Sequence, residues 1–288
     1  MLGDIAAASI TGLVLGSMYA LASVGLTLQW GVLRILNFAH GGFITFGAYF
    51  AWVGLLYFGW SYPAAILLAI LLPFLLGFVL NRTSIRPLQG RPESDTNIFI
   101  ATLATSVAIE NIIIIVFGGR DKYIPPLAEG SMTIGMITVN LQQITIMIVA
   151  PLSLILLLII LVKTKTGSAV RAVAQDVDGA AIVGIDSKRI YSYTIAMGCA
   201  LAGLAGVLLG VIFYLSPHMG GEPLTRALFA MVLGGMGSVK GTIYGAYIIG
   251  IIDAFARFFM GMFWASPVLF VVFILILVIR PQGLYGIS

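Results

Sequence analysis

The chain has 288 residues, of which 60% are hydrophobic and 9% are charged, and its formal net charge is +4. Soluble domains carry roughly 25% charged residues, so this composition excludes an ordinary water-exposed surface. It predicts a protein that lies within a lipid bilayer. Cys199 is the single cysteine, which excludes an internal disulfide.

Runs of about 20 apolar residues predict membrane helices. In chain order these runs cover 5–28, 43–58, 63–80, 97–117, 144–162, 191–215, 241–262 and 267–279. The run 227–239 is apolar but short, and the sequence leaves open whether it crosses the membrane or forms a re-entrant half-helix. We therefore predict an all-α polytopic integral membrane protein, one transmembrane domain over 1–288, with eight or nine membrane segments.

The stretch 29–42 interrupts the apolar pattern with Arg34, Asn37, His40, Gly41 and Gly42, and it predicts a break between two helices. Broken helices in transporters free backbone groups for a substrate where they line a cavity. Two interpretations stay open for Asn37 and His40. They contact the substrate pathway, or they cap the two flanking helices.

Basic residues indicate the orientation, because cytoplasmic loops are enriched in Lys and Arg. The loops 81–96 and 163–190 carry most of them and are predicted to be cytoplasmic, whereas 118–143 and 216–225 are predicted outer loops. The N-terminus is then outside and the C-terminus cytoplasmic. The positive charge reflects this bias, and without a further basic patch no nucleic-acid partner is predicted.

The sequence contains no H-E-x-x-H or G-x-S-x-G motif, and its two histidines, His40 and His218, are far apart. The segment 234–242 resembles a phosphate-binding loop, but Val239 replaces the glycine that must precede the lysine. We therefore predict no catalytic residue, no metal site and no cofactor in this chain. Energy for uphill transport would come from an ion gradient or from a partner protein.

Ionisable residues inside membrane segments are rare and functional by default. Here they are Glu110, Asp253 and Arg257, and the last two are four residues apart, so they can pair on one helix face. One interpretation is a buried ion-pair cluster of all three near the outer surface. The other is that Glu110 lines the substrate path or braces a half-helix.

The loop 163–190 predicts two short helices, over 167–177 and over 178–182, with Asp178 as the cap of the second and Gly184 at its end. It is rich in alanine, with Ala169, Ala172, Ala174, Ala180 and Ala181. Such a small-residue surface can enter a groove on a soluble partner. A plain solvated linker is the alternative.

Several motifs together resemble one known family. They are V-L-R-I-L-N-F-A-H-G-G at 32–42 with F-G-A-Y at 46–49, the loop segments 167–176 and 180–185, Glu110-Asn111, G-G-M-G-S at 234–238 and R-P-Q-G-L at 280–284. In this order, from residue 11 to residue 286, they resemble the shorter type of permease subunit of branched-chain amino acid ABC importers. Urea and short-amide importers carry similar subunits, so the substrate is not fixed.

The resemblance implies a permease that moves branched-chain amino acids inward across the bacterial inner membrane. Its implied partners are a second homologous permease, two ABC ATPase subunits that bind ATP and Mg²⁺, and a periplasmic binding protein. The implied fold is similar to the vitamin-importer type of ABC permease. An ion-coupled carrier and a non-transport membrane scaffold are the alternatives from other functional classes.

Two sets of site residues follow from these interpretations. The residues expected to couple the chain to the ATPases are Arg171, Ala172, Asp176, Ala180, Ala181, Gly184 and Ile185. The residues expected along the substrate pathway are Asn37, His40, Gly41, Gly42, Tyr49 and Glu110.

Overall fold

The computed structural model describes residues 2–134 and 137–285, and most of this part is helical. Within it, eight helices are long and apolar enough to cross a bilayer. They are α1 (Leu2–Leu33), α2 (Ala39–Leu56), α3 (Tyr62–Leu80), α4 (Ser94–Phe117), α5 (Leu141–Lys163), α8 (Ser187–Ile212), α10 (Val239–Met260) and α11 (Met262–Ile279). The predicted helical membrane protein is confirmed, and each of the eight long apolar runs corresponds to one of these helices.

Shorter elements join the long helices. A π-helical turn, η1 (Asn81–Ile85), continues α3; α6 (Lys165–Gln175) and α7 (Val177–Ile182) lie between α5 and α8; and α9 (Gly221–Gly234) precedes α10. Two strands, β1 (Ser131–Ile134) and β2 (Ile137–Asn140), pair antiparallel. The predicted outer loop 118–143 therefore holds a small hairpin and the start of α5, and 163–190 is largely helical.

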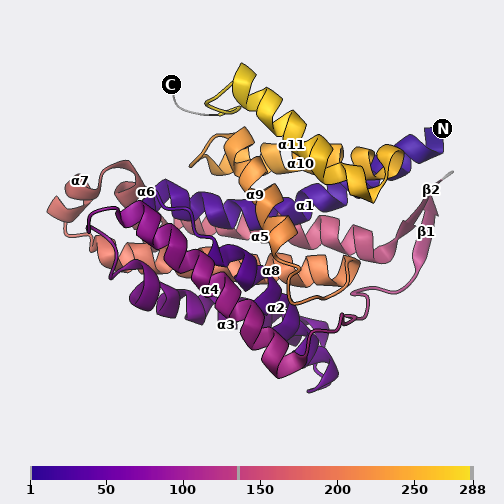
Figure 1. The fold of residues 1–288 in the computed structure, drawn as a ribbon, viewed down its shortest axis with the longest axis horizontal. Coiled ribbons are helices and arrows are strands. Elements are labelled where there is room, and N and C mark those ends of the chain that lie inside the picture. Colours follow the sequence, from indigo (N-terminus) through magenta and orange to yellow (C-terminus); the bar gives the residue numbers. More distant parts are fainter. Residues whose placement is uncertain (1, 135–136, 286–288) are drawn as a thin grey trace.

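The long helices form an elongated bundle, and the two ends of this bundle are different (Figure 1). The N-terminal end of α1 and the β1–β2 hairpin lie at one end, whereas α6 and α7 lie at the other. The backbone N–H groups of Leu284 and Tyr285 donate to carbonyls of Leu233 and Gly234 at the end of α9. This places the last described residues near the end of the bundle that holds α6 and α7, as the predicted orientation requires.

Helices α1 and α10 pack closely and run in opposite directions. The Ser17 and Tyr247 hydroxyls are 3.1 Å apart, and further along α1 the Thr27 and Thr242 hydroxyls are 2.8 Å apart. Gly16 lies against Tyr247 as well. Gly12 lies against Ile251, and Gly12 and Gly16 are four residues apart on α1. Such small residues let membrane helices pack closely, since lipid provides no hydrophobic effect to drive helices together.

Helix α8 also runs antiparallel to α1, because Gly25 lies against Gly198 and the Gln29 amide donates to the Ile195 carbonyl at 3.3 Å. Helices α8 and α10 are therefore parallel to each other. The chain between them must return across the bundle, and it does so through the non-helical segment 213–220 followed by α9.

Helix α9 cannot cross a bilayer by itself. Its 14 residues span about 21 Å at 1.5 Å per residue, less than the ~30 Å hydrocarbon core. The sequence left open whether 227–239 crosses the membrane. The chain crosses the bundle here through the segment 213–220 together with α9. The predicted loop 216–225 is too long, because α9 begins at Gly221, with Glu222 and Pro223 in its first turn as favoured at helix starts.

The core lies along α8. In its most apolar stretch 83% of the residues are buried, against 11% in α11. Gly206 in α8 lies directly against the backbone of Ile44 in α2, which lets these two helices approach closely. The outer helices expose large aliphatic side chains, such as Leu152 in α5 and Val278 in α11, and this surface suits a lipid solvent.

Candidate functional site

The junction between α1 and α2 is the first of the predicted sites. The non-helical part covers only 34–38, so the predicted break over 29–42 is too long. Arg34 adopts a left-handed conformation with φ of +58°, which turns the chain. The Asn37 side-chain oxygen accepts a hydrogen bond from the Ala39 N–H at 3.0 Å. Asn37 thus closes a turn directly before α2, whose N-cap residue is Phe38 and has no side-chain cap hydrogen bond.

His40, Gly41 and Gly42 lie inside the first turn of α2 and are buried. The His40 Nε2 donates to the Ala22 carbonyl in α1 at 2.9 Å, so this polar ring is tolerated within a helix and does not cap one. Gly41 contacts the backbone of Gly220, and Gly42 packs against α4. The motif thus lies where α1, α2, α4 and the start of α9 meet. The contacts of Gly41 and Gly42 are close enough to need residues without a large side chain.

Tyr49 is fully buried as well, with its ring centroid 5.4 Å from that of Phe117. Among the described residues, the Tyr49 hydroxyl, the Asn37 Nδ2 and the His40 Nδ1 have no hydrogen-bond partner. Direct contact of these residues with a substrate stays a prediction. Of the six predicted pathway residues, Glu110 is the one that is not buried.

Glu110 pairs with His218, whose Nδ1 lies 2.8 Å from the Glu110 Oε2. The Glu110 side chain is 23% exposed and the His218 side chain is 70% exposed. The pair links α4 to the segment that leads into α9, which fits the interpretation that Glu110 braces a short helix. The interpretation that placed Glu110 in one cluster with Asp253 is wrong, because its ion-pair partner is a residue of the outer segment.

Asp253 is the centre of a separate charged cluster. Its carboxylate is fully buried and accepts hydrogen bonds from the Tyr19 hydroxyl at 2.6 Å, the Arg226 Nε at 3.1 Å and the Arg257 Nε at 3.0 Å. Glu222 bridges both arginines and lies 2.8 Å from Arg257. The predicted pair of Asp253 and Arg257 is confirmed. Two carboxylates and two guanidinium groups balance, as buried charges require.

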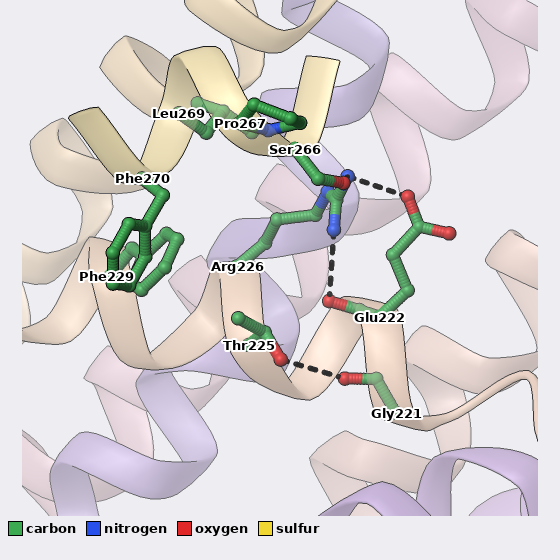
Figure 2. Close-up of a pocket in the computed structure, with 9 residues that line it drawn as sticks. All are labelled: Gly221, Glu222, Thr225, Arg226, Phe229, Ser266, Pro267, Leu269 and Phe270. Carbon is green, nitrogen blue, oxygen red and sulfur yellow. Dashed lines mark hydrogen bonds and ion pairs between the residues drawn. The ribbon is translucent and has the colours of Figure 1, made fainter. Parts of the chain in front are cut away.

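A pocket of about 500 Å³ opens between α9 and α11 (Figure 2). Its polar side is formed by Glu222, Thr225 and Arg226, and the Arg226 guanidinium also donates to Ser266 at 3.1 Å. Phe229 and Phe270 lie together away from these groups. Because Arg226 is already engaged by Glu222, Asp253 and Ser266, the polar wall carries no unpaired positive charge.

The described residues contain no group of three His, Cys, Asp or Glu side chains that could hold a metal ion. Asp253 forms ion pairs with two arginines, whereas Glu110 and His218 share a hydrogen bond. Both groupings join elements that are distant in the sequence and hold them in position.

The loop between α5 and α8 is anchored at its first helix. The Thr164 hydroxyl caps α6 by accepting from the Gly167 N–H at 3.0 Å, and the Arg171 guanidinium donates to the Leu161 carbonyl at the end of α5. Val170 is buried against the bundle. This loop is therefore a folded element, which argues against the plain linker interpretation.

The second helix of the loop, α7, leads into an exposed segment, Ala181, Ile182 and Val183, which we call the tip. Asp176 caps α7 by accepting from the Asp178 N–H at 3.0 Å, so the prediction of Asp178 as the cap is wrong. Asp178 is already helical, whereas Asp176 has the extended backbone that caps adopt. Gly184 follows the end of α7 with φ of +84°, as predicted.

The seven predicted coupling residues differ in exposure. Ala180 is buried, Ala172 and Ile185 are half-buried, and Arg171, Asp176, Ala181 and Gly184 are exposed. The most exposed apolar side chains of the tip are Ile182, at 86%, and Val183, at 73%. Sequence reasoning did not single out these two residues.

Comparison with known proteins shows which family this chain is similar to. Residues 9–279 match the family described as branched-chain amino acid transport system / permease component. The high-affinity branched-chain amino acid transport system permease protein LivH of Escherichia coli (strain K12) is 31% identical, over 96% of this chain and 93% of that protein. BraD of Pseudomonas aeruginosa, a permease protein with the same description, is also 31% identical, over 96% and 94%.

The chain belongs to this permease family. Among solved structures, PsaBC from Streptococcus pneumoniae in complex with Fab aligns over 96% of this permease and 91% of that chain, with 16% identity and a TM-score of 0.49. Similarity to the vitamin-importer type of ABC permease stays a prediction.

Some site residues of the permease carry no signal in the sequence. His218 is 108 positions from Glu110 and lies in a segment that reads as a loop, and Tyr19 is 234 positions from Asp253. Only the contacts between helices bring these residues together. For Ile182 and Val183 a signal exists, since two large aliphatic residues follow Ala181 in a loop that is otherwise rich in alanine and charge.

Proposed function

We propose that this permease is the transmembrane subunit of an ATP-driven importer that moves branched-chain amino acids inward across the bacterial inner membrane. Family membership and the printed descriptions of the LivH and BraD relatives support this substrate class. The multi-pass helical fold supports the location in a membrane. A periplasmic binding protein would deliver the substrate at the end of the bundle that holds the N-terminus.

The observation that carries the ATP-driven mechanism is the α6–α7 element. It is anchored to the bundle through α6, yet it presents Ala181, Ile182 and Val183 outside, a few positions before the basic Lys188 and Arg189 in the sequence. Exposed apolar residues in such surroundings mark a contact with another protein. We assign this tip to a groove on a soluble ATPase, with one ATPase for each of two permeases.

This chain itself has no phosphate-binding loop. The proposed ATPases would bind ATP and Mg²⁺, and their movement would reach the permease through α6. Because Arg171 holds α6 to the end of α5, a displacement of the tip is transmitted to the membrane helices. The predicted absence of a cofactor and of enzymatic activity in this chain belongs to the same proposal.

The substrate pathway is proposed to run along a surface shared with a second homologous permease. Asn37, His40 and Tyr49 are buried inside this chain, so an open path through its own core would require these residues to separate. Glu110 reaches the surface next to the exposed Asn111. Polar side chains at membrane depth favour a protein-lined or watery path over lipid.

The first test is a pull-down from mild detergent with this chain as bait, comparing the wild type with Ala181→Trp. Gly119→Trp is the matched control, because Gly119 also has open space around it but lies in the outer loop. We expect two ATPase subunits and a second permease with the wild type and the control, and loss of the ATPases with Ala181→Trp. Recovery of no ATPase with the wild type would overturn the ATP-driven mechanism.

Uptake by the reconstituted complex tests the substrate. We expect ATP-dependent leucine uptake that persists when ionophores collapse the ion gradients. Uptake of urea or a short amide instead of leucine would place the permease in the related importer class. Uptake that needs an ion gradient and Glu110, but no ATPase, would identify an ion-coupled carrier. If none of these compounds is taken up and Ala181→Trp has no effect, the chain would be a membrane scaffold without transport activity.

A further inference from the structure

The pair of Glu110 and His218 has features that a purely structural ion pair does not need. The Asp253 cluster is closed, since its central carboxylate is fully buried and receives three partners. In contrast, the Glu110–His218 pair is open, with side-chain exposures of 23% and 70%. An exposed ion pair of this kind contributes little to stability, so its position at the outer part of α4 calls for another role.

Each member of the pair keeps one polar atom free. The contact joins the Glu110 Oε2 to the His218 Nδ1, and within the described residues neither the Glu110 Oε1 nor the His218 Nε2 takes part in another hydrogen bond. A carboxylate oxygen accepts from an ammonium group, and a histidine ring donates from both nitrogens only in its protonated form. In that form the pair presents an acceptor for an ammonium group beside a donor for a carboxylate.

One open position and one aliphatic side chain lie close to the pair along the chain. Gly221 is three residues after His218, its N–H donates to the His218 carbonyl at 3.3 Å, and a Cβ atom added at Gly221 would have nothing within 4 Å. On α4, Val107 is three residues before Glu110 and is 50% exposed, and residues at this spacing lie on one helix face. The open pair is thus bordered by an unfilled position on one side and by an aliphatic side chain on the other.

We propose that Glu110 and His218 bind the charged groups of a zwitterionic α-amino acid, with the Glu110 carboxylate on the α-ammonium and the His218 ring on the α-carboxylate. The inference rests on the proposed function, because it assumes that an amino acid passes this surface. The contact is transient, since both groups can return to pairing with each other when the substrate leaves. Val107 would border the aliphatic side chain.

The experiment uses the whole transporter in mild detergent, without binding protein, and measures ligand binding by saturation-transfer NMR, which detects weak complexes. The probes are L-leucine, leucinamide, which keeps only the ammonium group, and 4-methylpentanoate, which keeps only the carboxylate. Four variants are compared with the wild type: Glu110→Gln, His218→Gln, Gly221→Val and, as the control, Glu129→Gln. Glu129 is exposed in the outer loop and is outside the pair.

We expect a crossed pattern. Glu110→Gln weakens leucine and leucinamide at least tenfold, which corresponds to about 1.4 kcal/mol, and leaves 4-methylpentanoate unchanged. His218→Gln weakens leucine and 4-methylpentanoate by a similar factor and leaves leucinamide unchanged. Glu129→Gln changes none of the three. Gly221→Val, which fills the open position without altering a charge, weakens all three probes.

Equal loss of all probes in both charge variants would show a structural role and overturn the inference, and so would the absence of any loss. Either result leaves the proposed function standing if the wild-type complex still takes up leucine with ATP. If the wild type takes up no leucine, the proposed function itself fails. The two failures are therefore distinguishable.

Discussion

The Asp253 cluster gives the sharpest prediction for stability, through the variant Asp253→Asn. This change removes the fully buried carboxylate that lies between Arg226 and Arg257, and leaves the two arginines with the partly exposed Glu222 as their shared acidic partner. Removing one partner of a buried ion pair costs about 3–5 kcal/mol, because it leaves the other charge uncompensated. For a protein of this size each 1 kcal/mol lowers the melting temperature by roughly 2–4 °C, so a decrease of about 6–20 °C is expected.

Two further variants separate charge from hydrogen bonding. Tyr19→Phe removes one hydrogen bond to the same carboxylate and should cost about 1.5–3 kcal/mol, less than Asp253→Asn. The double variant Asp253→Asn with Arg226→Met removes the stranded charge together with its partner. It should be more stable than the sum of the single variants predicts, because contacting residues are not additive.

The measurement is thermal unfolding in lipid nanodiscs, followed by tryptophan fluorescence, with helical content checked at low temperature. A melting temperature for Asp253→Asn within about 2 °C of the wild type would refute the reasoning. A double variant whose loss equals the sum of the two single losses would also refute it, because Asp253 and Arg226 would then act independently.

Three other variants test the packing and the caps. Gly206→Ala places a methyl group against the Ile44 carbonyl oxygen of α2, and we expect it to reduce the yield of folded protein severalfold in size-exclusion chromatography. Gly119→Ala, with open space around it, should have no effect on this yield. Gly167→Ala meets carbonyl oxygens at the end of α5 and should displace α6, so ATPase copurification decreases although the α7 tip is unchanged; full copurification would contradict the anchoring role. Asn37→Ala removes the hydrogen bond from the Ala39 N–H that closes the turn before α2 and should cost about 1 kcal/mol, seen as a melting temperature about 2–4 °C lower.

The membrane segments could be predicted from the sequence because a bilayer imposes length and hydropathy on each helix separately. The errors occur where neighbouring helices decide the local structure. His40 and the two following glycines resemble a helix break, yet they are helical because α1 supplies a carbonyl for the imidazole and other backbones occupy the space beside the glycines. A single helix pattern contains no information about such partners.

The candidate site follows the same rule. The pairing of Asp253 with Arg257 could be predicted because the two residues are one helical turn apart. The partners of Glu110 and the contribution of Tyr19 to Asp253 could not, because they depend on the packing of helices that are far apart in the chain. In the cytoplasmic loop, the positions of the two helices were close to correct, whereas the cap depended on backbone angles at Asp176.

The short helix α9 has a consequence for how the protein is made. It carries Glu222 and Arg226 in its first two turns, and an arginine at the centre of an isolated membrane helix costs about 2.5–3.5 kcal/mol on insertion scales. Within α9 Arg226 pairs with Glu222, but its buried partner Asp253 is on α10, which emerges later from the ribosome. We therefore expect α9 and α10 to enter the bilayer together, as one hairpin. Glycosylation mapping of chains that end before and after α10 can follow this order directly.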